Sequence, residues 1–318
     1  MIVAAGVLCW RRIAGEPYIL VIHRAAHDDY SFPKGKQDPG ESVPETAIRE
    51  LREESRIRAA LGPYLDAVHY HVGGKPKVVH YWTSQISAEQ VKDSAKHFSP
   101  NHEVDELLWL PFAEAQRLLT YDFDRELLTR LEGQLPTLDR PILTVGVLRH
   151  AKATSRVDWS KGEASRPLTS HGQSQSTHLT ALLQCWGAFQ QIVTSPWQRC
   201  LSTVQPYATA CGTRVRRASE LTETDYATDP EASEHLVTDV VSQGRSALFC
   251  THRPVLPGVL SAVGALIDEP ARALLLSHAT LAPAELVIAQ IAQTGDAEHP
   301  FELVTVATYA PFDEENES

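Results

Sequence analysis

Three glutamates near the end of one expected helix are the first side chains whose types and spacing suggest chemistry. Glu50, Glu53 and Glu54 crowd the last turns of that helix. The carboxyl end of a helix already carries partial negative charge, so acidic side chains there are unfavourable. Carboxylates at these spacings supply the hard oxygen ligands that Mg²⁺ prefers, and a cation removes their repulsion. The alternative is a solvated acidic face neutralised by Arg49 and Arg52.

The start of this helix is also marked in the sequence. Ser42 and Glu45 have the spacing of a capping box, and Pro44 suits a first turn. At 100° per residue one apolar arc forms along the helix, which predicts the face that meets the core. Its members are Val43, Ala47, Ile48 and Leu51.

The wider spacing around this helix resembles the signature of Nudix hydrolases, Gx5Ex7REUxEExGU, in which U is aliphatic. Eight of its nine fixed positions are present: Gly35, Glu41, Arg49, Glu50, Leu51, Glu53, Glu54 and Ile57. Arg56 stands where the family has glycine, a residue that normally ends the helix with positive φ. A non-glycine residue there costs about 1 kcal/mol or shifts the helix end.

The resemblance implies a loop–helix–loop that binds Mg²⁺, with Mn²⁺ as a second acceptable ion, and hydrolyses nucleoside polyphosphates by metal-assisted attack of water. It also implies an α/β/α sandwich, and a loop held to the helix by Glu41 and Arg49. The catalytic acids implied are Glu50 and Glu53. The implied metal ligands are the carbonyl of Gly35, Glu50, Glu53, Glu54 and, from outside the motif, Glu103, with Glu106 as the alternative to the last.

Cationic and aromatic residues beside the motif resemble the branch that cleaves dinucleoside polyphosphates. Lysines can clamp additional phosphates, and an aromatic ring can stack on a base. For Tyr81 and its neighbour Trp82, ordinary strand packing is the alternative. The substrate-binding candidates are Arg24, Lys34, Lys36, Lys77 and Tyr81.

A second group of reactive side chains follows expected strands in the other half of the chain. Arg149 and His150 come directly after the strand "ILTVGVL", and His252 follows "ALFCT". Ligands of open α/β sheets gather at such carboxyl ends of strands. Arg199, in "TSPWQRC", follows a third strand, and Glu223 lies in "SELTETDY". A neutral histidine can attack phosphorus while arginines hold the phosphate oxygens.

This group resembles the histidine phosphatase superfamily, most closely its small SixA-type branch, over roughly residues 142–310. The segment "RPLTSHGQSQ" also fits that family, whereas Ala151 replaces the usual glycine after the nucleophile. The resemblance implies a catalytic set of His150 as nucleophile, Glu223 as acid for the leaving oxygen, and Arg149, Arg199 and His252 as phosphoryl-binding groups.

The elements that must position these two sites change in character along the chain. The first half reads as mixed α+β, and the second as alternating strands and helices, which predicts a mostly parallel sheet covered by helices. The stretch "GQLPTLDRP" has two prolines and a glycine in nine residues, which predicts a linker near Gly133–Arg140. We therefore expect a Nudix domain at 1–135, a linker at 136–141, a histidine phosphatase-like domain at 142–312 and an acidic tail at 313–318.

Composition limits the partners and the compartment. The net charge of −11 argues against nucleic-acid polymers as partners. Five scattered cysteines without CxxC spacing predict reduced thiols rather than a disulfide framework or a zinc site. No signal peptide or membrane span is expected, so a cytoplasmic protein is predicted.

A Nudix domain followed by a SixA-like phosphatase domain resembles the MutT-type proteins of actinobacteria. This resemblance implies hydrolysis of 8-oxo-GTP, 8-oxo-dGTP and diadenosine polyphosphates, with a phosphatase domain of unassigned substrate. Self-association that brings one molecule's phosphatase domain to another's Nudix domain is a further possibility. Two alternatives stay open: a nucleotide sensor with little turnover, and an active Nudix domain joined to a purely structural second domain.

Overall fold

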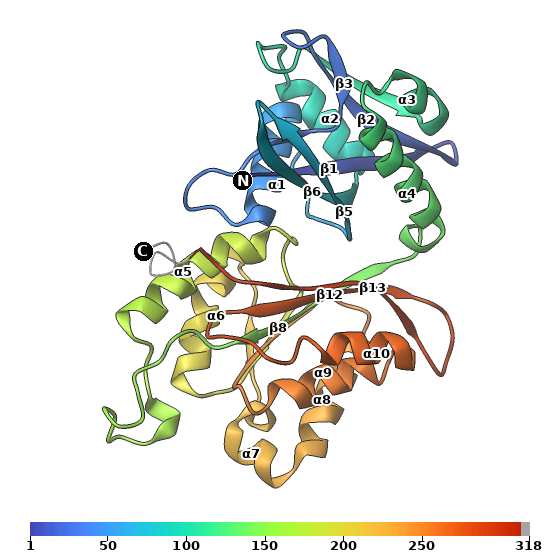
Figure 1. Ribbon diagram of the computed structural model, residues 1–318. Coiled ribbons are helices and arrows are strands. Elements are labelled where there is room, and N and C mark those ends of the chain that lie inside the picture. The colour runs from blue at the N-terminus through green and yellow to red at the C-terminus, as the bar shows by residue number, and fades with distance from the viewer. Residues whose placement is uncertain (313–318) are drawn as a thin grey trace. The chain divides into compact units, whose positions relative to one another are not determined.

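The computed structural model describes residues 1–312, and the predicted acidic tail at 313–318 lies outside them. Contacts divide the chain into two compact units, the first being Met1–Pro136 and the second starting at Thr137 (Figure 1). Each unit has its own sheet with helices packed on it, in agreement with the mixed α/β fold class predicted. Within residues 1–312, no helix has the length and apolar character needed to cross a membrane.

The sheet of the first unit is built around one long buried strand. Its strands are β1 (Ile2–Ile13), β2 (Glu16–Arg24), β3 (Asp29–Ser31), β4 (Lys34–Lys36), β5 (Tyr64–Val72), β6 (Lys75–Gln85) and β7 (Glu106–Pro111). Along the order β3-β2-β1-β6-β5, β1 pairs parallel with β6, while β4 pairs with β1 and β7 with β2. The short strand β4 places Gly35 opposite Ala5 of β1 and therefore fixes the loop that precedes the acidic helix.

The helices of the first unit are α1 (Val43–Ser55), α2 (Ala88–His97), α3 (Phe112–Leu118) and α4 (Asp122–Leu138). Helix α1 packs against β1 and β4. Helix α4 corrects the predicted linker, because it continues through Gly133 and Pro136. Leucines at helical spacing hold this turn against the core despite the proline: Leu128, Leu131, Leu135 and Leu138 are all buried. The connection before the next strand is therefore only Asp139–Pro141.

The second unit contains a mostly parallel sheet. Its strands are β8 (Ile142–Arg149), β9 (Gln191–Thr194), β10 (Val215–Arg217), β11 (Ala247–Thr251), β12 (Leu286–Gln293) and β13 (Phe301–Tyr309). Strands β10, β9, β11 and β8 run parallel in that order, and β12 and β13 extend the sheet antiparallel. The carboxyl ends of β8, β9 and β11 consequently share one edge of the sheet, the edge at which the predicted phosphatase residues lie.

Helices cover both faces of this second sheet. Figure 1 shows α5 and α6 on one face and α8, α9 and α10 on the other. The core on the latter face joins β8, β11 and β12 to apolar side chains of α8 and α9. The helices are α5 (Ser170–Gln184), α6 (Gln198–Cys211), α7 (Glu223–Thr228), α8 (Pro230–Ser242), α9 (Leu256–Gly264) and α10 (Glu269–Leu276).

Candidate active sites

Both ends of the acidic helix α1 are capped. At its start, the backbone N–H of Ser42 donates a hydrogen bond of 2.9 Å to the Glu45 carboxylate, as a capping box requires. At its end, Arg56 adopts a left-handed conformation with φ of 58°, and its N–H donates to the carbonyl of Arg52. The arginine thus takes the conformation that the glycine of the motif normally takes, and the turn after the helix is kept.

Replacing Arg56 with glycine is expected to raise the free energy of unfolding by about 1 kcal/mol, because glycine has no Cβ to oppose positive φ. Urea denaturation of the two proteins measures this. Arg58→Gly is the matched control, since Arg58 is also exposed but is absent from the residues with positive φ. Equal or lower stability of Arg56→Gly would show that Arg56 is not strained.

Arg49 joins the loop before α1 to the acidic side chains of the helix. Its guanidinium donates to Glu41 at 2.7 Å, to Glu50 at 2.8 Å, to Glu53 at 3.1 Å and to the backbone carbonyl of Lys36 at 2.8 Å. One arginine therefore holds both the loop carbonyl and three carboxylates. Loss of this side chain would release the loop and leave like charges facing one another.

The acids of α1 differ in their surroundings. Glu54 is buried, accepts a hydrogen bond of 2.7 Å from the backbone N–H of Lys34, and burial raises its pKa to about 8. Burial also raises the pKa of Glu50, and the charges of Glu53 and Glu103 raise it further. The charge of Glu103, the first candidate for the acid from outside the motif, therefore reaches Glu50.

The predicted convergence of Glu50, Glu53 and Glu54 is not what the structure shows. No group of three or more acidic, histidine or cysteine side chains in residues 1–312 is arranged as a metal site. Arg49 draws Glu50 and Glu53 toward itself, whereas Glu54 turns to the Lys34 amide.

The donor set nevertheless fits a hard divalent cation. A Cβ added to Gly35 would lie only 1.9 Å from the Glu50 carboxyl carbon, so a larger residue there would push that carboxylate away from the loop. The carbonyl oxygen of the loop and the glutamate oxygens are all hard ligands.

The predicted phosphate-binding residues separate into exposed and enclosed groups. Lys36 is exposed and Lys77 is half-buried. Lys34 is buried, and its ammonium donates to the Ser31 hydroxyl at 3.1 Å. Arg24 makes a bidentate ion pair with Asp29: its Nε donates to Oδ1 at 2.8 Å and its Nη2 donates to Oδ2 at 2.5 Å. Lys34 and Arg24 are therefore engaged inside the unit.

The prediction that Tyr81 stacks on a base of the substrate is wrong. It is 0% exposed, because its ring points into the core of the first unit from β6. The half-exposed aromatic stack lies elsewhere: Phe123 stacks between Tyr70 and Tyr121, at centroid distances of 5.1 and 5.0 Å. The Lys77 ammonium lies 5.5 Å from the ring centre of Tyr70. The only sequence signal for this stack was the aromatic spacing in "TYDFD", which is too short to be specific.

Asp124, at the start of α4, is a residue that sequence reasoning missed. It is fully buried, and neither carboxylate oxygen has a hydrogen-bond partner among the described residues. Burial raises its pKa to about 7, an effect that the positive charges of Lys34 and Arg24 reduce. The folded chain thus holds a proton at Asp124 more tightly than the unfolded chain.

A carboxyl with a raised pKa makes stability fall as pH rises from its unfolded value toward its folded one, here from 3.8 to about 7. We therefore expect Asp124→Asn to show a smaller loss of unfolding free energy between pH 5 and about pH 8. Urea denaturation across that range measures it. Glu126→Gln, at an exposed position of the same helix, is the control. Identical pH profiles for the wild type and Asp124→Asn would contradict the assignment.

In the second unit, His150 is held as a neutral imidazole in one tautomer. Its Nδ1 lies 2.7 Å from the carbonyl oxygen of Ala151, which can only accept, so Nδ1 carries the proton. Its Nε2 accepts a hydrogen bond of 3.2 Å from Nε of Arg199. Burial lowers the pKa of His150 to about 3, and the nearby arginines add to the shift. Nε2 therefore stays unprotonated at neutral pH, with its lone pair directed at the Arg199 guanidinium.

The remaining predicted phosphatase residues meet around His150. Arg199 is fully buried and donates to the Glu223 carboxylate at 3.0 Å. His252 is also fully buried, with its ring centre 5.3 Å from that of His150 and its Nδ1 3.6 Å from Glu223. Burial lowers the pKa of His252, so it too is neutral. Arg149 donates to the carbonyl of Leu281 at 2.7 Å and faces the same pocket.

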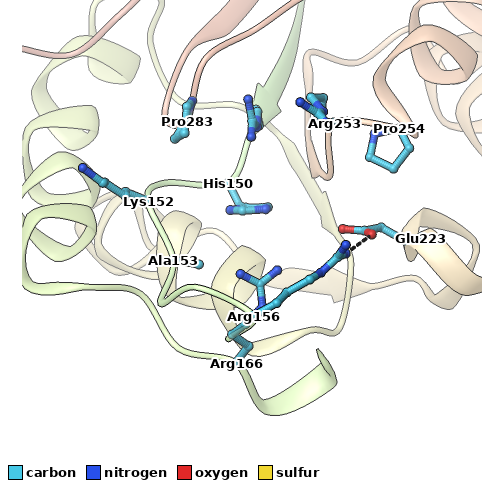
Figure 2. A pocket seen from close by; sticks show the side chains of 10 residues that line it. His150, Lys152, Ala153, Arg156, Arg166, Glu223, Arg253, Pro254 and Pro283 are labelled. Carbon is cyan, nitrogen blue, oxygen red and sulfur yellow. Dashed lines mark hydrogen bonds and ion pairs between the residues drawn. The ribbon is translucent and has the colours of Figure 1, made fainter. Parts of the chain in front are cut away.

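This pocket has a volume of about 440 Å³ and is strongly cationic. Figure 2 shows His150 between an upper wall with Arg253 and a lower wall with Arg156 and Arg166. Lys152 lies to one side and Glu223 opposite. Sequence reasoning missed four cations here, Lys152, Arg156, Arg166 and Arg253, although Arg253 directly follows His252 and Arg166 begins "RPLTSHGQSQ".

Comparison with known proteins follows the same two-part division. Residues 2–131 match the profile described as NUDIX domain, and residues 145–238 match the histidine phosphatase superfamily (branch 1). The 8-oxo-(d)GTP phosphatase of Mycolicibacterium smegmatis is 34% identical over 268 residues, which is 81% of this chain and 79% of that protein. The asymmetrical bis(5'-nucleosyl)-tetraphosphatase of Caenorhabditis elegans is 29% identical over 124 residues, 37% of this chain and 85% of that protein.

Among solved structures, a SixA-type protein from Nakamurella multipartitia aligns with a TM-score of 0.40 and 21% identity, covering 52% of this chain and 95% of its own. The long alignment with the Mycolicibacterium protein runs across most of both chains and hence includes both units. The chain therefore belongs to the Nudix hydrolase family of enzymes and carries, after its Nudix domain, a second domain of the histidine phosphatase superfamily.

Proposed function

We propose that the first unit hydrolyses phosphoanhydride bonds of nucleoside polyphosphates with Mg²⁺, for which Mn²⁺ can substitute. The 8-oxo-(d)GTP and bis(5'-nucleosyl)-tetraphosphate hydrolases that it resembles suggest 8-oxo-GTP, 8-oxo-dGTP and diadenosine polyphosphates as substrates. The observation that carries the proposal is the arrangement of Arg49, which ties the loop at Lys36 to Glu41, Glu50 and Glu53. When bound, the metal would neutralise phosphate oxygens and lower the pKa of the attacking water.

The chain's own residues would hold and orient the reactants. Gly35, Glu50, Glu53, Glu54 and Glu103 supply oxygen ligands for the cation. Lys36 and Lys77, the two candidate lysines that reach solvent, would bind phosphates of the substrate. Lys34 and Arg24 lie inside the unit and would not contact the substrate. Their positive charges would partly offset the negative charges of the nearby carboxyl groups, which are Glu54, Asp29 and Asp124.

We further propose that the second unit is a phosphatase that needs no metal. His150 Nε2 attacks phosphorus, while Arg149, Arg199 and His252 hold the phosphoryl oxygens. Glu223 would give a proton to the leaving oxygen, and its contacts with Arg199 and His252 keep its carboxyl group beside the phosphoryl-binding residues. The fixed tautomer of His150 supports this proposal most directly. The five cysteines, which form no disulfide within residues 1–312, fit a reducing cytoplasm.

A panel of nucleotides supplied with and without Mg²⁺ tests both proposals. Release of pyrophosphate or of nucleoside diphosphate only with the metal would support the first. Release of orthophosphate in the presence of a chelator would support the second. Tight nucleotide binding without turnover would instead favour the sensor, and metal-dependent turnover alone would leave the second domain structural.

A further inference from the structure

The pocket around His150 contains more positive charge than one phosphoryl group requires. We propose that it binds a substrate with a second phosphate next to the one transferred, that is, a compound of the nucleoside diphosphate class. The inference rests on the phosphatase activity proposed for the second unit. It concerns the outer part of the pocket, where Arg253 adds its charge next to Arg149, which would contact both the transferred phosphoryl group and the second phosphate.

The inner part of the pocket already accounts for one phosphoryl group. Arg199 is fully buried, and its Nε donates a hydrogen bond of 3.2 Å to His150 Nε2, the nitrogen proposed to attack phosphorus. His252 lies beside it and is bonded to the Ser195 hydroxyl at 2.8 Å. A tetrahedral phosphoryl group attacked by His150 would meet these groups first, and it would not need the rim of the pocket.

The positive charge of the lower wall is balanced by carboxylates of the protein itself. Arg156 donates to Glu163 at 3.0 Å and to Glu223 at 2.7 Å. Arg166 donates to the other oxygen of Glu163 at 3.0 Å. These two arginines therefore stabilise the wall and its loop, and less of their charge is available to a ligand.

The guanidinium groups of the upper wall, by contrast, can still bind an anion. Arg149 donates to the Leu281 carbonyl, but its buried Nε has no hydrogen-bond partner among residues 1–312. Arg253 is exposed on the rim, and no hydrogen bond or ion pair within the described chain engages its guanidinium. Burial lowers the pKa of Arg149, and the charge of Arg253 lowers it further, so the two guanidinium groups repel each other. A phosphate between them would remove that repulsion.

The shape of the site favours a small diphosphate over a phosphorylated protein side chain. A volume of about 440 Å³ suits a small-molecule ligand. A phosphorylated imidazole would bring no second anion to Arg149 and Arg253. Hydrolysis of longer nucleoside polyphosphates, the class of reaction proposed for the first unit, would supply such a compound.

The chemistry balances without a further reactant. The lone pair of His150 Nε2 forms an N–P bond to the terminal phosphorus while the bond from that phosphorus to the bridging oxygen breaks. The nucleoside monophosphate leaves with the electron pair, and Glu223 can supply its proton. Water then attacks phosphorus, the N–P bond breaks, and orthophosphate and free His150 result, with a proton returned to Glu223.

Phosphate release by the full-length Glu53→Gln protein in a chelator tests the inference, with GDP, GMP, p-nitrophenyl phosphate and a phosphohistidine peptide as probes. We expect kcat/KM for GDP to exceed that for GMP at least about tenfold, and Arg253→Gln to reduce this ratio about tenfold, because it removes one charge-assisted contact to the second phosphate. Arg216→Gln, an exposed arginine on β10, should leave the ratio unchanged.

The outcomes separate the inference from the activity on which it rests. Turnover of GMP or the peptide as fast as GDP, or a ratio indifferent to Arg253, would overturn the diphosphate subsite but keep the phosphatase. If no probe is hydrolysed, the phosphatase proposal fails, and calorimetry on the same protein decides the subsite. Arg253-dependent binding of GDP tighter than that of GMP would support it, and its absence would overturn it.

Discussion

Replacing Glu53 with glutamine is expected to lower metal-dependent hydrolysis of nucleoside polyphosphates by roughly 10²- to 10⁴-fold, the usual effect of losing a carboxylate that takes part in proton transfer. The change removes one charge from the group that would hold the cation. Glu53 is about half exposed, at 48%, and its contact within the chain is the hydrogen bond with Arg49. The fold should therefore survive, and the loss should appear in kcat rather than in protein yield.

The measurement is the initial rate with 8-oxo-dGTP or diadenosine tetraphosphate at saturating Mg²⁺, together with a thermal melt. Glu89→Gln is the matched control, because Glu89 is exposed on α2, outside the motif. A Glu53→Gln protein that turns over at the wild-type rate would remove the catalytic role proposed for this glutamate. Titration with Mg²⁺ or Mn²⁺ in the presence of nucleotide then reports whether the cation still binds.

Replacing His150 with alanine is expected to abolish both the phosphoenzyme and the metal-independent phosphatase activity, because the proposed attacking atom, Nε2 of His150, is removed. Nucleotide cleavage by the first unit should be unaffected. Labelling with a ³²P substrate, followed by gel analysis under alkaline conditions, measures the covalent intermediate. His235→Ala, an exposed histidine on α8, is the control.

The pH dependence gives a second test of His150. Its pKa is lowered to about 3, so the histidine stays neutral through mildly acidic conditions. Phosphoenzyme formation is therefore expected to persist at pH 5, where an ordinary histidine with a pKa near 6.5 would be almost fully protonated. A decline centred near pH 6.5 would contradict the lowered pKa of His150. A phosphoenzyme that still forms in His150→Ala would show that His150 is not the nucleophile.

The local sequence by itself determined the parts of this protein that depend on short-range spacing. The capping box at Ser42, the acidic turns of α1 and the strand that ends at Arg149 follow from periodicity and turn chemistry over a few residues. The gathering of the candidate residues around His150 was also predictable, because parallel strands bring their carboxyl ends to one edge. The end of α4 was not predictable from local sequence. Burial of the leucines of this helix in the folded chain outweighs the helix-breaking effect of Pro136.

Only the tertiary structure decided which charged and aromatic groups face solvent. Tyr81 and Asp124 are buried in the folded first unit, and Arg24 is engaged by Asp29 across the pairing of β2 with β3. The walls of the phosphatase pocket likewise combine a loop after β8 with the turn after β11. Such long-range contacts set burial and local charge, and burial decides whether a given side chain binds substrate, shifts a pKa or supports the fold.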